Sequence, residues 1–323
     1  MDNSRLHLTL PLAILGAILA VSTASIFIRF AQREAPSLVI AAFRLTFASL
    51  ILAPIALTSH RAELRGLTRR ELLLALLSGV FLALHFATWI SSLEYTTVAS
   101  SVVLVSTSPL WVALLSPLVL HERLTRPVLI GMLLALTGGV VIALSDACVW
   151  QNGLACPSLA EFIKGEAFFG NFLALAGAWM VAGYLLIGRR LRAKMSLVPY
   201  IFVVYSIAAV ALIIIMFASG KTPLGYSPMT YVWMLLLALV PQLIGHSIYN
   251  WALRYMPAAL VAVTTLGEPI GSTILAYFIL REAPTWIKLG GAAMILAGIY
   301  IASRVKSAIG LRGSEERNGA DQT

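Results

Sequence analysis

Charged side chains are scarce in this sequence. Only 11% of its 323 residues are Asp, Glu, Lys or Arg, whereas 59% are hydrophobic, and the mean hydropathy is +0.90. A soluble domain carries about 25% charged residues, so this chain has too few polar groups to cover a globular surface. The composition disfavours a soluble enzyme, a disordered protein and a nucleic-acid-binding protein. It suits a protein whose solvent is the lipid bilayer.

Cysteine and catalytic motifs are also nearly absent. The two cysteines, Cys148 and Cys156, are too few for a disulfide scaffold, and no histidine pair lies near them to complete a zinc site. The chain contains no HExxH and no CxxC motif, and Ile215 stands where a phosphate-binding loop ending at residues 220–222 would need its first glycine. We therefore expect no metal site, no cofactor, no ATP hydrolysis and no enzymatic activity.

Long apolar stretches are what the chain does have. Each is about 18–24 residues long, enough to cross the hydrocarbon core as a helix. The ten predicted spans are 8–28, 38–58, 72–92, 97–120, 127–145, 168–187, 197–219, 231–253, 258–280 and 285–303. The prediction is an all-α, multi-pass membrane protein. Its expected parts are five helices in 1–146, a loop at 147–167, five helices in 168–304 and a disordered polar tail at 305–323.

Lys and Arg are distributed unevenly over the two sides of this predicted topology. Sixteen lie on the side that carries both termini, six on the other side, and one, Arg44, inside a span. The positive-inside rule then places both termini in the cytoplasm. The net charge of +9 therefore reflects topology, and nucleic acid is not needed as a partner. We expect a location in a bacterial inner membrane.

The loop at 147–167 holds both cysteines on the predicted periplasmic side. They bracket residues 149–155, a segment able to turn, and the periplasm is oxidising. A disulfide between Cys148 and Cys156 is one interpretation, and two free thiols is the other.

The two halves of the chain repeat each other. Residues 95–139 match residues 255–299 at a constant offset of 160, without a gap. The matched pairs are Tyr95 and Tyr255, Ala99 and Ala259, Pro109 and Pro269, Glu122 and Glu282, Thr125 and Thr285, Gly131 and Gly291, and Gly138 and Gly298. Because each half holds an odd number of spans, the second half is predicted to be inverted. Inverted repeats place a binding site near the midplane and permit alternating access, which indicates a transporter.

The doubled motif resembles a known family. A proline, a glutamate thirteen residues later and a glycine nine residues after that occur at Pro109, Glu122 and Gly131, and again at Pro269, Glu282 and Gly291. This pattern is similar to the EamA-type repeat of the drug/metabolite transporter superfamily, over nearly the whole chain except the tail. The intramembrane histidine, the Trp-rich spans and the long middle loop look most like the YddG-type amino-acid exporters. The resemblance implies export of small metabolites, including aromatic amino acids.

Ionisable residues within the spans are the first candidates for the substrate site, because they are costly in lipid and usually face a cavity. Glu268 lies in a Gly- and Pro-containing segment, where Pro269 removes a backbone donor and frees the carbonyl of Thr265. A carboxylate at such a helix break suits an ammonium group or a proton, or it serves only structure. Arg44 either clamps a substrate carboxylate, pairs with Glu268, or extends to the outer interface.

Further candidates are polar or aromatic residues deep within the spans. Their rings and hydroxyls suit an apolar side chain or a cation, although each can equally serve packing. They are His85, Trp89, Ser106, Ser108, Trp111, Trp179, Tyr184, His246 and Asn250, with Pro109 and Pro269 as helix breaks. Spans three, four, eight and nine are expected to line the cavity, and spans five and ten to be peripheral.

The sequence thus predicts an exporter of amino acids or related small metabolites that works by alternating access. Two other functions stay open. One is export of drug-like organic cations, which would use Glu268 but not Arg44. The other is a membrane-embedded enzyme acting on lipid-linked substrates, although the cytoplasmic loops are merely basic. The expected partners are a small-molecule substrate and the bilayer; the oligomeric state is not fixed, and a monomer is compatible with the sequence.

Overall fold

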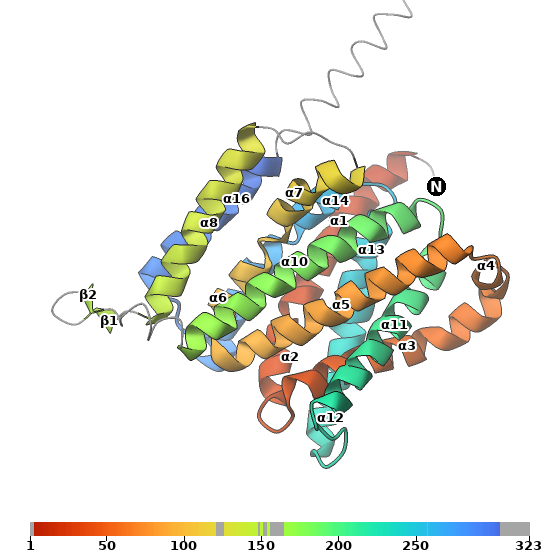
Figure 1. The fold of residues 1–323 in the computed structure, drawn as a ribbon, viewed down its shortest axis with the longest axis horizontal. Helices are drawn as coiled ribbons and strands as arrows, with labels where there is room; N and C mark the ends of the chain where they lie inside the picture. Colours follow the sequence, from red (N-terminus) through yellow and green to blue (C-terminus); the bar gives the residue numbers. More distant parts are fainter. Residues whose placement is uncertain are drawn as a thin grey trace, which may run out of the picture.

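Helices make up almost all of the described chain (Figure 1). The computed structural model describes residues 3–120, 126–147, 149–150, 154–155, 165–256 and 258–303. Within these ranges the extended segments are β1 and β2, an antiparallel pair of two-residue strands in the middle loop. Cys148, Cys156 and the tail lie outside the described residues, so the disulfide and the disordered tail remain predictions.

The first half is a run of helices. They are α1 (Asn3–Ser22), α2 (Ala24–Ala31), α3 (Ser37–Ser59), α4 (Arg61–Arg65), α5 (Arg69–Tyr95), α6 (Val98–Val105), α7 (Ser108–Leu120) and α8 (Arg126–Ala147). The strands β1 (Val149–Trp150) and β2 (Leu154–Ala155) follow. Capping fixes the start of the long helix α5: the Thr68 hydroxyl accepts from the amide of Glu71, whose carboxylate accepts from the amide of Thr68.

The second half repeats this plan with two segments of π-helix. It comprises α10 (Glu166–Arg192), α11 (Leu197–Ala218), α12 (Pro228–Leu237), η1 (Ala238–His246), α13 (Ser247–Ala252), α14 (Ala258–Thr264), α15 (Gly267–Leu275), η2 (Ala276–Leu280) and α16 (Trp286–Ser303). The π-helical turns of η1 surround Pro241, which cannot donate the usual helical hydrogen bond.

Eight of the described helical segments are long and apolar enough to span a bilayer. They are Leu10–Ala31, Ser37–Ser59, Arg69–Tyr95, Val98–Leu115, Glu166–Arg192, Leu197–Ala218, Pro228–Ala252 and Val261–Leu280. The other two predicted spans coincide with α8 and α16, whose apolar stretches, Leu129–Ile142 and Trp286–Gly298, are shorter. The expectation of a helical, multi-pass membrane protein is therefore confirmed.

The outer surface of the bundle is apolar. Leu19, Leu50, Leu73, Val210 and Ile214 each expose more than half of their side-chain surface. Such exposure is expected where lipid replaces water around the protein, because only apolar side chains fit the hydrocarbon.

Helices from the two halves interleave in the bundle. The long helices α5 and α10 lie along each other, α1 packs against η1, and α3 packs against α11 (Figure 1). Helices α8 and α16 pack mainly on one another at one edge of the molecule, away from the centre. The core is therefore built jointly by both halves.

Glycines allow α8 and α16 to approach closely. A Cβ atom added at Gly138 would lie 2.6 Å from the carbonyl oxygen of Gly291, and one added at Gly298 would lie 2.9 Å from the backbone nitrogen of Ala135 and against the carbonyl of Gly131. The small residues of the predicted fifth span thus serve helix packing.

Candidate substrate-binding site

A cavity lies at the centre of the bundle, where five groups of helices meet. Its walls come from α5, the junction of α6 and α7, α10, the junction of η1 and α13, and the junction of α14 and α15. The lining residues are His85, Trp89, Val105, Ser106, Ser108, Val181, Tyr184, Leu185, His246, Tyr249, Asn250, Thr265 and Glu268. The volume open to the centre of a water molecule is about 50 Å³. A single water needs about 10–15 Å³ on this measure, so the cavity is narrow in this state.

Two broken helices meet at the cavity. Helix α6 ends at Val105 and α7 begins at Ser108; α14 ends at Thr264 and α15 begins at Gly267. Each break comes shortly before a proline, Pro109 or Pro269, because proline has no N–H to continue the hydrogen-bond ladder. The sequence predicted that the carbonyl oxygen of Thr265 has no hydrogen bond, but this is wrong. The oxygen accepts a hydrogen bond from the backbone amide of Glu268 at 2.9 Å.

Arg44 is completely buried on α3, directly behind the cavity wall. Its Nε donates to the side-chain oxygen of Gln242 at 2.8 Å, and its guanidinium carbon lies 4.1 Å from the centre of the Phe86 ring and 6.0 Å from that of Trp89. Its burial excludes extension to the outer interface in this state. Within the described ranges, no carboxylate lies within 4 Å of its guanidinium, Glu268 included.

Hydrogen-bond donors around Arg44 exceed the acceptors. Both terminal nitrogens of Arg44, the side-chain nitrogen of Gln242 and the indole nitrogen of Trp89 are buried and have no hydrogen-bond partner among the described residues. Unpaired buried donors are rare and costly, particularly on a charged group. The two terminal nitrogens of Arg44 therefore meet no acceptor from the described residues in this state.

The two histidines are held by aromatic neighbours. His85 Nδ1 lies 2.9 Å from the carbonyl oxygen of Gly177 on α10; because a carbonyl only accepts, Nδ1 is the donor. The His85 ring stacks on Trp89, with ring centres 5.8 Å apart and an angle of 10° between the planes. His246 meets the edge of Phe86 at 5.4 Å. His85 and Trp89 thus offer a flat aromatic wall to the cavity.

A chain of hydrogen bonds joins α10, α13 and α11 beside the cavity. The Tyr184 hydroxyl donates to the side-chain oxygen of Asn250 at 2.7 Å, and the side-chain nitrogen of Asn250 donates to the Tyr205 hydroxyl at 3.2 Å. All three residues are buried. The network fixes α10 and α11 against α13.

Comparison with known proteins matches this architecture to one family. The pattern of the EamA-like transporter family fits residues 9–144 and fits again at residues 168–304. The chain belongs to the EamA-like transporter family.

Relatives of this EamA-like transporter extend over nearly its whole length. An uncharacterized transporter of Archaeoglobus fulgidus is 27% identical and covers 93% of this chain and 98% of its own. The uncharacterized transporter YetK of Bacillus subtilis is 24% identical, with coverage of 89% and 84%. The pseudopaline exporter CntI of Pseudomonas aeruginosa is 24% identical, with coverage of 91% and 96%. A solved crystal structure has the same fold, with a TM-score of 0.62 at 19% identity over 91% of this chain and 96% of that one.

The family places this protein among transporters of small molecules and excludes an enzyme, which removes the lipid-linked-substrate alternative. The resemblance to EamA-type repeats is confirmed. The amino-acid substrate and the role of each site residue stay predictions.

Most of the candidate residues line the cavity of the EamA-like transporter, but Arg44, Trp111 and Trp179 do not. Trp111 and Trp179 lie outside the lining and contact each other edge to face, with ring centres 5.4 Å apart. The Trp111 indole nitrogen donates to the Thr107 hydroxyl at 3.2 Å. Their positions deep within the predicted spans did not show whether they line the cavity or pack between helices.

Some lining residues were not predicted. Tyr249 lies one position before Asn250, and its buried hydroxyl has no partner among the described residues. Helix α10, the sixth span, supplies Val181 and Leu185, which look like any other apolar residues of a membrane helix. Tyr184 lies on the same helix, three residues from Val181, and its predicted role in the site could have indicated that this helix lines the cavity.

Proposed function

We propose that this EamA-like transporter exports amino acids or closely related metabolites that carry both a carboxylate and an amine. The central observation is the surplus of buried donors around Arg44. Arg44 lies behind Trp89 in this state, so a substrate carboxylate supplies the missing acceptor once the cavity extends past Trp89; the guanidinium fork then suits its two oxygens. Gln242 orients Arg44 by accepting from its Nε, which leaves the two terminal nitrogens for the ligand.

Glu268 supplies the opposite charge. It lines the cavity at the start of α15, and the hydroxyl-bearing residues Ser106, Ser108 and Thr265 line the same cavity. A carboxylate among hydroxyls suits a substrate ammonium. Arg44 and Glu268 thus serve the two ends of a zwitterion, and the stacked rings of His85 and Trp89 take an apolar or aromatic side chain.

The contacts between helices support an inverted repeat with ten spans. At the offset of 160, Gly138 corresponds to Gly298 and Gly131 to Gly291. Gly138 packs against the carbonyl of Gly291, and its counterpart Gly298 packs against the carbonyl of Gly131. An approximate two-fold axis that relates the halves requires this pair of equivalent contacts. Phe86 and His246 are equivalent positions by the same offset, and their rings touch. We therefore assign α8 and α16 as the fifth and tenth spans.

Alternating access follows from this arrangement, because a two-fold-related pair of halves can exchange conformations around a fixed central site. With the positive-inside distribution, both termini lie in the cytoplasm of a bacterial inner membrane. The likeness to the pseudopaline exporter CntI supports outward transport. A monomer contains the complete cavity.

Uptake by purified protein in proteoliposomes tests the proposal. Unlabelled amino acid inside the vesicles should drive counterflow of radiolabelled amino acid, and Arg44→Gln and Glu268→Gln should each abolish most of it. Trp111→Phe, outside the lining, is the control and should transport normally. Normal counterflow by folded Arg44→Gln and Glu268→Gln would refute the zwitterion site. Loss in Glu268→Gln alone, with transport of organic cations, would favour the cation exporter.

Thermal unfolding of the same proteins separates substrate binding from pairing of the two residues with each other. If Arg44 and Glu268 stabilise one another, each single substitution should lower stability and the double substitution should restore it. They make no direct ion pair in this state, so the double substitution should restore little of the stability that the single substitutions lose.

A further inference from the structure

We propose that Arg29 and Glu282 form the gate that closes the central cavity at the end of the protein opposite Asn3 and Ser303. The gate joins the two halves in this state and must open in each transport cycle. This inference rests on the alternating access proposed above, but it does not depend on the substrate.

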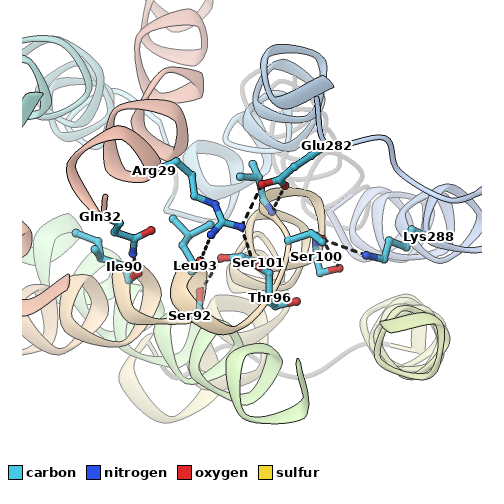
Figure 2. Close-up of polar contacts among 12 residues, drawn as sticks. Arg29, Gln32, Ile90, Ser92, Leu93, Thr96, Ser100, Ser101, Glu282 and Lys288 are labelled. Atoms are coloured by element: carbon cyan, nitrogen blue, oxygen red, sulfur yellow. Dashed lines mark hydrogen bonds and ion pairs between the residues drawn. The ribbon is translucent and has the colours of Figure 1, made fainter. Parts of the chain in front are cut away.

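Arg29 stands at the centre of the contacts at this end (Figure 2). It lies at the end of α2, and Nη2 of its guanidinium contacts the Glu282 carboxylate at 3.1 Å. The same guanidinium donates to the carbonyl oxygens of Leu93 and Thr96, the latter at 2.9 Å. Glu282, in turn, accepts from the backbone amide of Val98 at 2.9 Å.

These contacts place each charge at the helix end that favours it. Arg29 binds carbonyls at the carboxyl end of α5, and Glu282 binds an amide at the amino end of α6. The partial negative charge of a helix C-terminus stabilises a cation, and the partial positive charge of an N-terminus stabilises an anion. The ion pair therefore bridges the break between α5 and α6, and three backbone groups hold it in place.

The gate connects the halves of the chain. Arg29, Leu93, Thr96 and Val98 belong to the first half, whereas Glu282 belongs to the second. Lys288 adds a parallel contact, because its ammonium donates to the Thr97 hydroxyl at 3.1 Å. By contrast, the neighbouring bonds of Gln32 to Ile90 (Figure 2) and to Ser37 stay within the first half and can move with it.

The gate also lies directly beyond the cavity. Leu93 follows the cavity residue Trp89 by four positions on α5, a rise of about 6 Å along a helix. Glu282 follows Arg281, whose φ of 61° and ψ of 27° lie in the left-handed region that side chains other than glycine rarely adopt. This backbone turn ends η2 and directs the next residue, Glu282, toward α6. Separating the two charges would open the cavity at this end.

The opposite end contains a matched arginine. Arg189 corresponds to Arg29 at the offset of 160, and it donates to the carbonyl oxygen of Leu253, the counterpart of Leu93, at 2.5 Å. Among the described residues Arg189 makes no ion pair. Position 122, the counterpart of Glu282, lies outside the described residues. Arg189 is therefore the matched control for Arg29.

Access of a water-soluble reagent to the cavity tests the gate. The reporter is Val181→Cys in a chain whose Cys148 and Cys156 are replaced by serine, labelled by a membrane-impermeant maleimide in intact cells and in inside-out vesicles. Leu224→Cys marks the side that the gate faces, because its turn is tied to this end by the bond from the Ser227 amide to Glu34. Arg29→Gln and Glu282→Gln should each raise labelling from that side about tenfold, a shift of about 1.4 kcal/mol in the conformational equilibrium.

The control variants identify the ion pair as the cause. The double variant Arg29→Gln/Glu282→Gln should label no faster than Glu282→Gln, because Glu282→Gln already removes the ion pair and the bonds of Arg29 to Leu93 and Thr96 lie within the first half. Arg29→Lys, which keeps the charge but not the fork, should give an intermediate rate. Arg189→Gln should not raise labelling from the gate side.

Unchanged labelling in folded Arg29→Gln and Glu282→Gln, with a reporter that reacts from both sides, would overturn the gate but leave alternating access intact. An equal rise in Arg189→Gln would also overturn it, since any loosened helix end would then suffice. A reporter that reacts from one side only, in every variant, would instead contradict alternating access itself. Labelling requires no substrate, so loss of the zwitterion site would leave these results unaffected.

Discussion

Adding one methyl group at Gly138 should separate the two helices that join the halves at the edge of the bundle. The new Cβ would lie 2.6 Å from the Gly291 carbonyl oxygen, 2.9 Å from a side-chain carbon of Ile295 and 3.0 Å from the Cβ of Met294. The carbonyl belongs to the backbone and cannot rotate away, so α8 and α16 must move apart. Overpacking of this kind costs about 1–3 kcal/mol.

Part of this cost is offset, because alanine in a helix interior is about 0.5–1 kcal/mol more favourable than glycine. Gly290→Ala isolates that gain: it lies on α16 with no atom within 4 Å of an added Cβ. We expect Gly290→Ala to raise stability slightly and Gly138→Ala to lower it by about 1–2 kcal/mol. Gly298→Ala should cost the same as Gly138→Ala within about 0.5 kcal/mol, because the two-fold arrangement exchanges their contacts.

The assay is thermal unfolding of the purified proteins in one detergent, followed by tryptophan fluorescence. At about 2–4 °C for each kcal/mol, Gly138→Ala and Gly298→Ala should melt several degrees below Gly290→Ala. Equal melting temperatures for Gly138→Ala and Gly290→Ala would refute the close approach of α8 and α16. A loss in Gly138→Ala alone would contradict the two-fold exchange.

Three further predictions concern residues around the site and its ends. Arg281→Gly should stabilise the folded protein by about 1 kcal/mol in thermal unfolding, because glycine adopts the left-handed conformation without strain; destabilisation would show that the Arg281 side chain matters more than its backbone. The Ser227 amide and the Thr230 hydroxyl lower the pKa of Glu34 by donating to its carboxylate. Glu34 therefore adds stability above its unfolded pKa that is lost as the pH falls through its folded pKa, so wild type should melt above Glu34→Gln at pH 7, and the difference should shrink as the pH falls below the unfolded pKa of about 4.3; a constant difference would contradict this. Gln242→Leu leaves Arg44 Nε without its acceptor, so it should raise the KM for carboxylate substrates about tenfold, the equivalent of one charged hydrogen bond, with little effect on substrates that lack a carboxylate; an equal loss for both would make Gln242 structural only.

The sequence predicted the membrane-spanning helices well because their signal is local. Apolar stretches, prolines and repeated glycines determine where helices run, break and pack, and the breaks before Pro109 and Pro269 lie close to their expected positions. In the structure, the apolar stretches on α8 and α16 are shorter than the eight segments that are long enough to span a bilayer.

Lining of the cavity was harder to predict because it depends on which face of each helix turns inward. Trp89 and Trp179 are equally deep in the sequence, yet only Trp89 lines the cavity. The contact of Arg44 with Gln242 joins residues 198 positions apart, and no local pattern encodes it. The gate was missed for the same reason: Arg29 and Glu282 looked like ordinary charges at the ends of spans.

The central claim is that Arg44 binds the carboxylate of the substrate. The most direct test measures the affinity of the transporter for a matched pair of compounds. Binding of an aromatic amino acid and of its amide, which differ only in the carboxylate, should be measured by calorimetry with wild type and Arg44→Gln. A charged hydrogen bond contributes about 1.5–3 kcal/mol, so wild type should bind the acid about tenfold to one hundredfold more tightly than the amide. Arg44→Gln should bind both alike. An equal preference for the acid in both proteins would contradict the account.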